Sequence, residues 1–298
     1  MGLRKDIWHS AIIKAPIAEI VGRGSLAGLE CFWLPDAGNY RFRADPFGLW
    51  QNDKLYLFCE YFDYRYKKGA IELFIYDKSY RLLDRRIILS EPWHLSYPYL
   101  IEAEGEIWML PEAWHSGQLT LYRAVEFPYR WEAASIINPG CIPIDATPVY
   151  YDGLWWLFYS PAWPLKFRKT RLEVAWAKTL SGPWHPHPHN PIHRGLSGSR
   201  AGGTPFIMGS KLVLPVQDCT QTYGKAIRPL YFDCLSRDKV ETRLGAPLGE
   251  PSGFPYPIDG VHTLSAAGEV TLIDVKHRAR SAKGALIALQ YEVRKRLF

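Results

Sequence analysis

Acidic residues occupy corresponding positions in a unit that this chain repeats five times. In each unit, a residue before a proline begins one strand, and a second strand ends on a polar residue. The first position holds Asp45, Tyr97, Thr147, Thr204 and, by register without the proline, His262. The second position holds Glu60, Glu112, Ser160, Gln217 and Asp274. Carboxyl groups gathered in one place can give and take protons; the alternative is that each acid caps a turn or pairs with an arginine.

Three residues of these units suit proton transfer or anion binding. Asp145 precedes Thr147 by two residues, so the period of a strand puts both on the same side. Glu112 lies beside apolar residues, where desolvation raises a carboxyl pKa enough for proton donation; the alternative is that it holds Arg200. Arg200 precedes a Gly-Gly turn, and its planar guanidinium suits a sugar acid or a nucleotide-sugar phosphate, with a blade-to-blade ion pair as the alternative.

Aromatic side chains could supply platforms for the apolar faces of sugars. Trp114, Trp163, Tyr97 and Tyr223 each follow or begin a segment near the expected axis. His262 is interpreted as a ligand contact, against the alternative of a structural histidine. The histidines at 185, 187 and 189 alternate with prolines, and such segments are extended and usually exposed, so we expect no metal site there.

The repeat itself predicts the architecture. A period of roughly 50 residues built of short strands is typical of a β-propeller, because one blade cannot bury its faces alone. Five copies predict an all-β, five-bladed β-propeller that forms a single domain over residues 1–298. A strand near residues 8–15 is expected to complete the last blade, helix should be scarce apart from one turn at 17–21, and a late strand is expected at 289–293. The expected blades are 32–92, 93–138, 139–195, 196–250 and 251–298.

Composition narrows the class of protein. The chain has 298 residues, 47% of them hydrophobic and 14% aromatic, which is enough for a large core. The formal net charge of +6 fits an acidic ligand or a membrane surface, but no basic stripe with a nucleic-acid motif occurs. The five cysteines show no zinc spacing, so reduced thiols are expected. Without an apolar signal segment or a run of about 18 apolar residues, we expect a cytoplasmic protein that does not span a membrane.

Several motifs make the prediction more specific. They are Ala44-Asp-Pro-Phe47, Ser96-Tyr-Pro-Tyr99, Pro111-Glu112, the connection Leu180-Ser-Gly-Pro-Trp-His-Pro-His-Pro-His-Asn-Pro-Ile192, Arg200-Ala-Gly-Gly-Thr-Pro-Phe206 and Gln217-Asp-Cys-Thr-Gln-Thr-Tyr-Gly224. The chain resembles the five-bladed propeller superfamily that includes glycoside hydrolase family 43. Within it, the pattern is similar to the N-terminal domain of glucosamine inositolphosphorylceramide transferase and its bacterial relatives, which look like accessory enzymes of surface-polysaccharide synthesis.

This resemblance implies roles for individual acids. Asp45 matches the carboxylate that activates water, and Asp145 could match the acid that tunes and orients, although it stands one residue further from its strand than usual. The family places the proton donor in a turn opening blade four, where this chain has Gly203. A substitute donor could come from Glu112, Glu102 or Asp218.

Three functions stay open at this point. The first is a carbohydrate-active enzyme acting on a glycosidic bond of a surface polysaccharide or glycolipid, with Asp45 as catalytic carboxylate. The second is a glycosyltransferase with a nucleotide-sugar donor, and the third is a non-catalytic glycan-binding or protein-interaction propeller. The expected ligand is a carbohydrate or sugar phosphate, with peripheral association with polysaccharide-synthesis machinery. No cofactor is expected; an axial calcium occurs in related propellers, but here His262 is its only hint.

Overall fold

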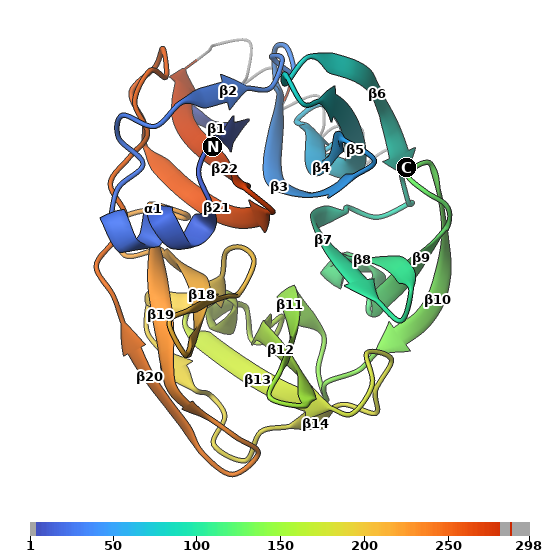
Figure 1. Ribbon diagram of the computed structural model, residues 1–298, viewed down its shortest axis with the longest axis vertical. Coiled ribbons are helices and arrows are strands. Elements are labelled where there is room, and N and C mark those ends of the chain that lie inside the picture. Colours follow the sequence, from blue (N-terminus) through green and yellow to red (C-terminus); the bar gives the residue numbers. More distant parts are fainter. Residues whose placement is uncertain (1–3, 281–286, 288–298) are drawn as a thin grey trace.

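The computed structural model describes residues 4–280 and residue 287. Five antiparallel sheets stand around a central axis, which confirms the predicted five-bladed β-propeller (Figure 1). Blades one and two comprise β3 (Arg41–Gln51), β4 (Lys54–Asp63), β5 (Lys68–Asp77) and β6 (Leu82–Leu89), then β7 (Ser96–Ala103), β8 (Glu106–Glu112), β9 (Leu119–Glu126) and β10 (Arg130–Ile137). Blade three comprises β11 (Pro143–Tyr151), β12 (Leu154–Pro161) and β13 (Arg171–Ala177), with β14 (His185–Pro186) and β15 (His193–Arg194) at its outer edge.

The fourth and fifth blades complete the ring. Blade four comprises β16 (Ser197–Ala201), β17 (Phe206–Met208), β18 (Lys211–Asp218), β19 (Ala226–Leu235) and β20 (Val240–Leu244). Blade five comprises β21 (Gly260–Ala267) and β22 (Val270–Arg280) together with β1 (Arg4–Ile13) and β2 (Cys31–Trp33). Because β1 pairs with β22 along its whole length, the first and last described strands lie side by side and close the propeller. The strand expected at 289–293 lies outside the described residues.

Tight hairpin turns join the inner strands of blades one and three. Asn52 and Asp53 between β3 and β4 have φ values of 49° and 62°, and Asp152 and Gly153 between β11 and β12 have 51° and 78°. Two successive left-handed residues give the turn whose twist matches the flanking strands of a hairpin. These turns set the register of the two innermost strands of each blade.

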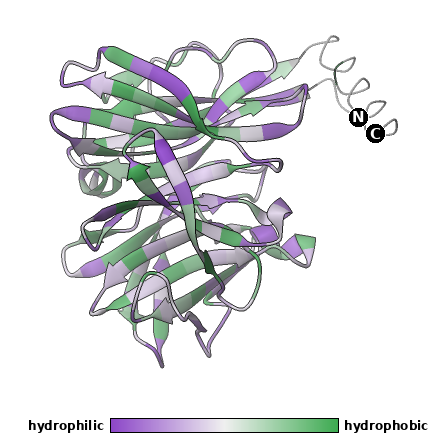
Figure 2. Cartoon of the chain, turned by 90° about the vertical axis from the view of Figure 1, so that its right-hand side faces the viewer, coloured by the Kyte–Doolittle hydropathy of each residue, from purple (hydrophilic) through white to green (hydrophobic). Residues whose placement is uncertain are grey.

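Hydrophobic side chains fill the space between neighbouring blades, while hydrophilic and hydrophobic residues alternate along the strands (Figure 2). Phe47 of β3 packs edge-on against Tyr97 of β7, with ring centroids 4.7 Å apart. Trp156 is 1% exposed between blades three and four. In the proline-rich segment, His185 and His189 are exposed as predicted, whereas His187 is 2% exposed, with its Nε2 2.9 Å from the Ser236 carbonyl oxygen.

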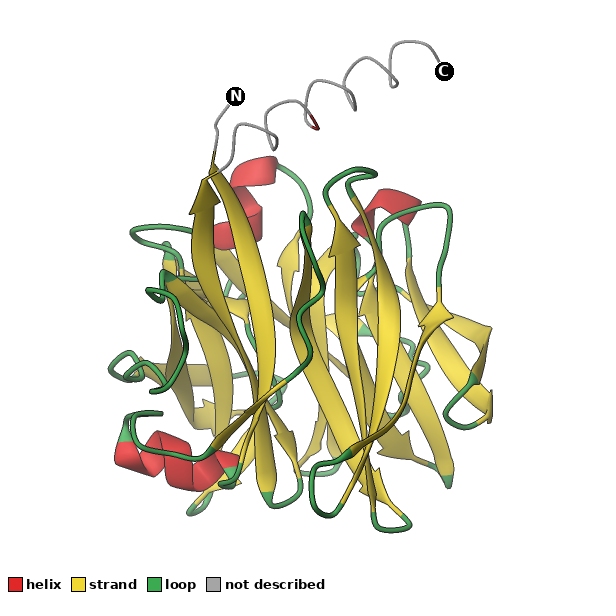
Figure 3. Ribbon diagram, turned by 90° about the horizontal axis from the view of Figure 1, so that it is seen from above, coloured by secondary structure: helices red, strands yellow, loops and turns green. Residues whose placement is uncertain are grey.

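Helices are short and lie at opposite ends. Figure 3 shows α1 (Ile17–Arg23) at one end of the propeller, and η1 (Trp114–Ser116) and η2 (Leu165–Lys169) at the other. In the part of the chain that the structure describes, no helix is long and apolar enough to cross a membrane. The end that carries η1 and η2 is where the inner strands β3, β7, β11, β16 and β21 begin, and it holds the candidate site.

Candidate active site

A cavity of about 540 Å³ opens on the axis at the end of the propeller that carries η1 and η2. Its lining combines carboxyl groups, cations and aromatic rings contributed by all five blades. The lining residues are Trp8, Phe42, Asp45, Glu60, Phe62, Lys67, His94, Ser96, Glu112, Trp114, His115, Ile144, Leu165, Arg168, Lys169, Arg200, Tyr223 and His262.

A β-bulge near the start of the inner strand aims the key side chains. In blade one, Asp45 and Pro46 together oppose one residue of β4, and in blade three Asp145 and Ala146 oppose one residue of β12. Asp45 and Asp145 have φ values of 50° and 46°, a left-handed conformation that is rare for residues other than glycine. Such bulges re-aim a side chain beside functional sites, and here each directs an aspartate toward the axis.

The bulges show that the predicted alignment of the five units is wrong in blades three and five. Asp145, not Thr147, is the counterpart of Asp45, and Thr147 is fully buried with its hydroxyl 2.9 Å from the Tyr97 hydroxyl. In blade five, Asp274 opposes the bulge itself. It is therefore not the counterpart of Glu112, which pairs with the residue before its bulge.

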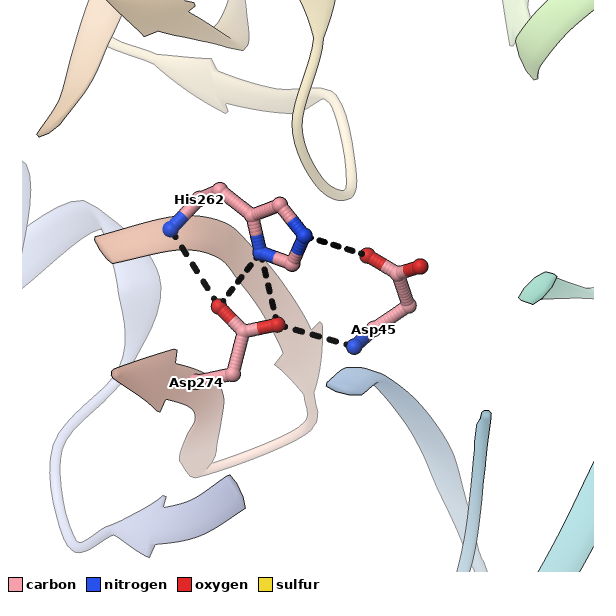
Figure 4. A group of neighbouring side chains, drawn as sticks. All are labelled: Asp45, His262 and Asp274. Atoms are coloured by element: carbon pink, nitrogen blue, oxygen red, sulfur yellow. Dashed lines mark hydrogen bonds and ion pairs between the residues drawn. The ribbon is translucent and has the colours of Figure 1, made fainter. Parts of the chain in front are cut away.

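Asp45, His262 and Asp274 form one buried hydrogen-bonded cluster (Figure 4). The Asp274 carboxylate accepts hydrogen bonds from the backbone N–H of Asp45 at 2.8 Å and of Thr263 at 3.0 Å, and its Oδ2 lies 2.7 Å from His262 Nδ1. His262 Nε2 lies 3.5 Å from Asp45 Oδ1, to which the Thr263 hydroxyl also donates at 2.9 Å. The indole of Trp8 stacks on the His262 ring with centroids 3.7 Å apart. The imidazole is thus fixed between two carboxylates.

Burial and neighbouring charge decide the ionisation of this cluster. Burial raises the pKa of Asp45 to about 6; His262 lowers it, and Asp274 and Asp145 raise it. For His262, burial alone would lower the pKa, but Asp274 and Asp45 raise it above its usual value. The contact therefore favours an ionised Asp45 beside a protonated imidazole.

Glu112 is the second carboxyl group of the cavity, and it favours its protonated form. It is 4% exposed, its Oε1 accepts a hydrogen bond from the Trp114 backbone N–H at 2.7 Å, and its Oε2 accepts one from the Ser96 hydroxyl at 3.1 Å. Burial and then the Asp145 charge raise its pKa to about 7, against the smaller lowering effects of the hydrogen bonds and of Arg200. Glu112 can therefore hold a proton at neutral pH and release it.

Glu60 adds a third carboxyl group. Its Oε1 lies 3.5 Å from His94 Nε2, and burial together with Asp45 and Glu112 raises its pKa well above the usual range. The Gly69 backbone N–H donates to His94 Nδ1 at 2.9 Å, so the proton of the neutral imidazole is on Nε2, facing Glu60. Burial lowers the pKa of His94 to about 4, so the imidazole is neutral at neutral pH, and the raised pKa of Glu60 favours its protonated form.

Asp145 is engaged by Arg200 in a bidentate ion pair. Arg200 Nε donates at 2.5 Å and a terminal nitrogen at 3.1 Å to the two carboxylate oxygens. The Gln217 amide is a further donor at 3.4 Å. Arg200 holds Asp145 and not Glu112, so the predicted alternative of a blade-to-blade ion pair applies, with a different acid. The guanidinium also lies over the Tyr223 ring, 5.2 Å from its centroid.

The backbone at Gly203 explains why this position of blade four holds no acidic residue. Its φ is 144°, and a Cβ atom there would lie 1.8 Å from the Leu264 carbonyl oxygen of the neighbouring blade. The two inner strands form a parallel bridge between these two residues. A glutamate cannot be accommodated at this position, so a proton donor must come from elsewhere in the cavity.

The residues predicted for the site divide into two groups. Asp45, Glu112, Trp114, Arg200, Tyr223 and His262 line the cavity, and Asp145 contacts it through Arg200. The other predicted residues lie away from the lining: Tyr97, Glu102, Trp163, Thr204 and Asp218.

The structure explains why each of these predicted residues lies outside the cavity lining. Tyr97 is buried beneath the cavity, where its hydroxyl accepts a hydrogen bond from the Gly203 N–H at 2.9 Å, and the Thr204 N–H donates to Leu264. Glu102 is exposed at the far end of β7 beside the β7–β8 turn.

The other two lie outside the cavity for different reasons. Asp218 borders a separate hollow and bonds Ser197, Thr220 and Arg228. Trp163 is 57% exposed outside the cavity and meets the Trp114 ring edge-on. Of the substitute proton donors considered, only Glu112 therefore lines the cavity.

Sequence reasoning missed several lining residues. Trp8 arrives from the N-terminal strand, His94 from a loop, His115 from η1, and Arg168 and Lys169 from η2. No local motif marks them, because their neighbours in space are distant in the sequence. Glu60 did carry a signal, since it pairs with the residue before the bulge of blade one as Glu112 does in blade two.

The cluster of Asp45, His262 and Asp274 also offers three donor atoms within 4.8 Å of one another. Three such donor atoms are a minimal set for holding a metal ion. A calcium ion takes six to eight oxygen ligands, whereas these groups satisfy one another and nearby backbone N–H groups. The residues present therefore do not fit a calcium site, and the proposed chemistry does not use a metal.

Comparison with known proteins supplies a family. The family described as "Glucosamine inositolphosphorylceramide transferase 1, N-terminal" matches residues 26–248. A protein named glucosamine inositolphosphorylceramide transferase 1 from Oryza sativa subsp. indica is 34% identical over 260 residues, covering 80% of this chain and 34% of the rice protein. The protein of that name from Arabidopsis thaliana is 38% identical over 202 residues, covering 66% of this chain and 26% of its own length. The chain thus spans about a third of the length of these curated relatives.

Solved structures share the fold. A family 117 glycoside hydrolase from Zobellia galactanivorans superposes with a TM-score of 0.57 over 95% of this chain and 93% of its own, at 13% identity. An α-L-arabinofuranosidase from Podospora anserina superposes with a TM-score of 0.60 over 85% of this chain and 94% of its own, at 10% identity. At such identities the likeness establishes the propeller fold alone.

Proposed function

Since the chain belongs to the family of the N-terminal region of glucosamine inositolphosphorylceramide transferase 1, we propose that its axial cavity binds a carbohydrate and acts on a glycosidic bond. Asp45 is the carboxylate that activates the attacking hydroxyl or water, and Glu112 is the acid that protonates the leaving oxygen. The relatives' activity belongs to proteins about three times as long, so the role of this chain rests on its own site.

One observation carries the proposal: two buried carboxyl groups with different ionisation line the same cavity. Asp45, with a pKa of about 6, is mostly ionised at pH 7, whereas Glu112, with a pKa of about 7, is about half protonated. Chemistry at a glycosidic bond uses one carboxylate and one carboxylic acid on either side of the bond. Two titratable groups whose surroundings separate their pKa values identify the base and the acid.

The remaining polar residues support these roles. His262 and Asp274 hold Asp45 in place, and the imidazolium favours its ionised form. Asp145 is held in place by Arg200, and the Asp145 charge raises the pKa of Glu112. Trp114 and Tyr223 add aromatic surface to the cavity wall, with Arg168 and Arg200 lying over their rings.

A second candidate is transfer from a nucleotide-sugar donor. Arg168 and Lys169 line the cavity, and within the described part of the chain neither forms a salt bridge with a carboxylate. Instead, Arg168 lies over the Trp114 ring at 3.7 Å from its centroid, and Lys169 over the Tyr223 ring at 5.2 Å. These cations suit a diphosphate leaving group, which needs no strong proton donor.

The two candidates are separated by a ligand panel. Thermal unfolding of the protein is recorded with neutral oligosaccharides, sugar acids and nucleotide sugars, because a ligand that binds the folded state raises Tm. The ligand that stabilises is then incubated with the protein, and its anomeric protons are followed by NMR. Asp45→Asn should keep binding and lose turnover, whereas the matched exposed variant Asp152→Asn should keep both.

The variant Glu112→Gln distinguishes the chemistries. Attack on an unactivated glycoside requires the acid, so turnover should fall by about 100-fold or more. Transfer from a nucleotide sugar should fall only slightly. Equal turnover by Asp45→Asn and the unsubstituted protein would refute both candidates.

A further inference from the structure

The mouth of the cavity carries exposed apolar side chains next to unneutralised cations. Trp163 and Leu165 are 57% and 56% exposed at the start of η2, on the segment that also forms the cavity wall through Leu165. Large apolar side chains exposed together at a functional site mark an interaction surface. Neither the cavity chemistry nor the packing of blade three requires them.

The positive charge of this segment lies on three neighbouring residues. Lys166, Arg168 and Lys169 follow Leu165 directly, and in the described residues none of them is within salt-bridge distance of a carboxylate. Aromatic faces hold these side chains instead, with Lys166 5.6 Å from the Phe167 ring centroid and Arg168 3.7 Å from that of Trp114. The charge is therefore available to an external partner.

Two neighbouring loops extend the same surface around the cavity mouth. The turn between β4 and β5 carries Tyr66, which is 60% exposed, beside Lys67 of the cavity lining. Leu196 of blade four is 43% exposed, and its neighbour Gly195 donates a hydrogen bond to the Thr170 carbonyl oxygen directly after η2. We call Tyr66, Trp163, Leu165, Lys166 and Leu196 the rim.

We propose that the rim docks the cavity mouth onto an anionic lipid bilayer. Tryptophan and tyrosine favour the membrane–water interface, exposed leucines can enter the acyl region, and lysine and arginine are attracted by anionic headgroups. A sugar polymer alone would not explain the aliphatic Leu165 and Leu196, because pyranose faces stack on aromatic rings. The inference is independent of Asp45 and Glu112, and it places the cavity opening at the headgroup level.

Vesicle co-sedimentation tests the docking. The purified chain should bind vesicles of phosphatidylcholine containing about one third phosphatidylglycerol, bind pure phosphatidylcholine weakly, and dissociate as salt is raised to about 0.5 M. The double variant Trp163→Ser/Leu165→Ser should bind about tenfold more weakly, since two inserted apolar side chains are lost. Lys166→Glu should weaken binding to the anionic vesicles alone.

Matched controls come from the same chain. Tyr150 and Ile207 are 59% and 50% exposed outside the rim, so Tyr150→Ser/Ile207→Ser removes similar apolar area and should leave vesicle binding unchanged. Asp45→Asn should also bind vesicles normally, which separates this test from that of the proposed function. Quenching of tryptophan fluorescence by brominated lipid should disappear in Trp163→Ser.

Three outcomes would overturn the proposal. The first is no binding to anionic vesicles, and the second is equal loss in the rim and control variants. The third is loss of binding to a soluble oligosaccharide in the rim variants without any vesicle binding, which would make the rim a glycan surface.

Discussion

Replacing Glu112 with glutamine should change how the stability of this protein depends on pH. The carboxyl group is 4% exposed, and its pKa is about 7 in the folded protein against an ordinary value of 4.5. A glutamine can keep its contacts, because the amide oxygen can accept from the Trp114 N–H and the amide nitrogen can donate to the Ser96 hydroxyl. The substitution therefore removes one titration and little else.

The sign follows from proton binding. Between pH 4.5 and about 7 the unfolded chain has lost the Glu112 proton while the folded protein keeps it. The folded protein binds more protons in this window, so its stability falls as the pH rises, and the full loss is present above about pH 7. A pKa of about 7 in place of 4.5 corresponds to about 3 kcal/mol. Glu112→Gln does not titrate and does not suffer this loss.

Urea denaturation at about pH 4 and pH 8 measures the effect. The difference in free energy of unfolding between Glu112→Gln and the unsubstituted protein should grow in favour of the variant by about 3 kcal/mol from the lower to the higher pH. The titration of Asp45 occurs in both proteins and cancels, whereas the loss of the Glu112 charge, which helps to raise the pKa of Glu60, changes the difference in the same direction. Glu102→Gln is the control, since this exposed carboxyl on the neighbouring strand is solvated before and after unfolding. The same difference at both pH values would refute the reasoning.

Two further predictions concern the backbone and the ion pair of the site. Arg200→Met should lower the free energy of unfolding by about 3 kcal/mol, because it leaves the buried Asp145 carboxylate without its cation; urea denaturation measures the loss, and a variant as stable as the unsubstituted protein would contradict the account. Gly203→Ala should cost more than about 3 kcal/mol or prevent folding, because its Cβ would lie 1.8 Å from the Leu264 carbonyl oxygen; a circular dichroism melt matching that of the unsubstituted protein would show that the strands can separate there.

The fold could be predicted because its signal is repeated. Four proline-marked strand starts and a fifth without the proline, with turn residues such as Asn52 and Asp152 at matching places, define the blades and their number. The site could be predicted only in part, because the units were aligned on the proline, and the bulge does not lie at a fixed distance from that proline. Asp145 lies three residues before its proline but adopts the same left-handed conformation as Asp45, directly before its own. No sequence motif indicates this left-handed conformation.

Contacts between segments that are far apart in the sequence account for the other misses. Trp8 reaches the His262 ring only because the N-terminal strand closes the last blade. Arg168 of blade three contacts the Trp114 ring of blade two. Neither contact has a local pattern, so pattern and spacing could not reveal them. Conversely, Glu102 sits in the repeat at a plausible place but at the wrong end of its strand, and only the direction of the strand relative to the cavity decides this.

The central claim is that Asp45 and Glu112 serve one cavity as base and acid. It is tested most directly by the pH dependence of kcat/KM on the ligand that the binding panel identifies. The account predicts a bell-shaped profile with its acid limb near pH 6, where Asp45 ionises, and its alkaline limb near pH 7, where Glu112 loses its proton. A rate that stays constant between about pH 5 and pH 8, or an unchanged alkaline limb in Glu112→Gln, would contradict it.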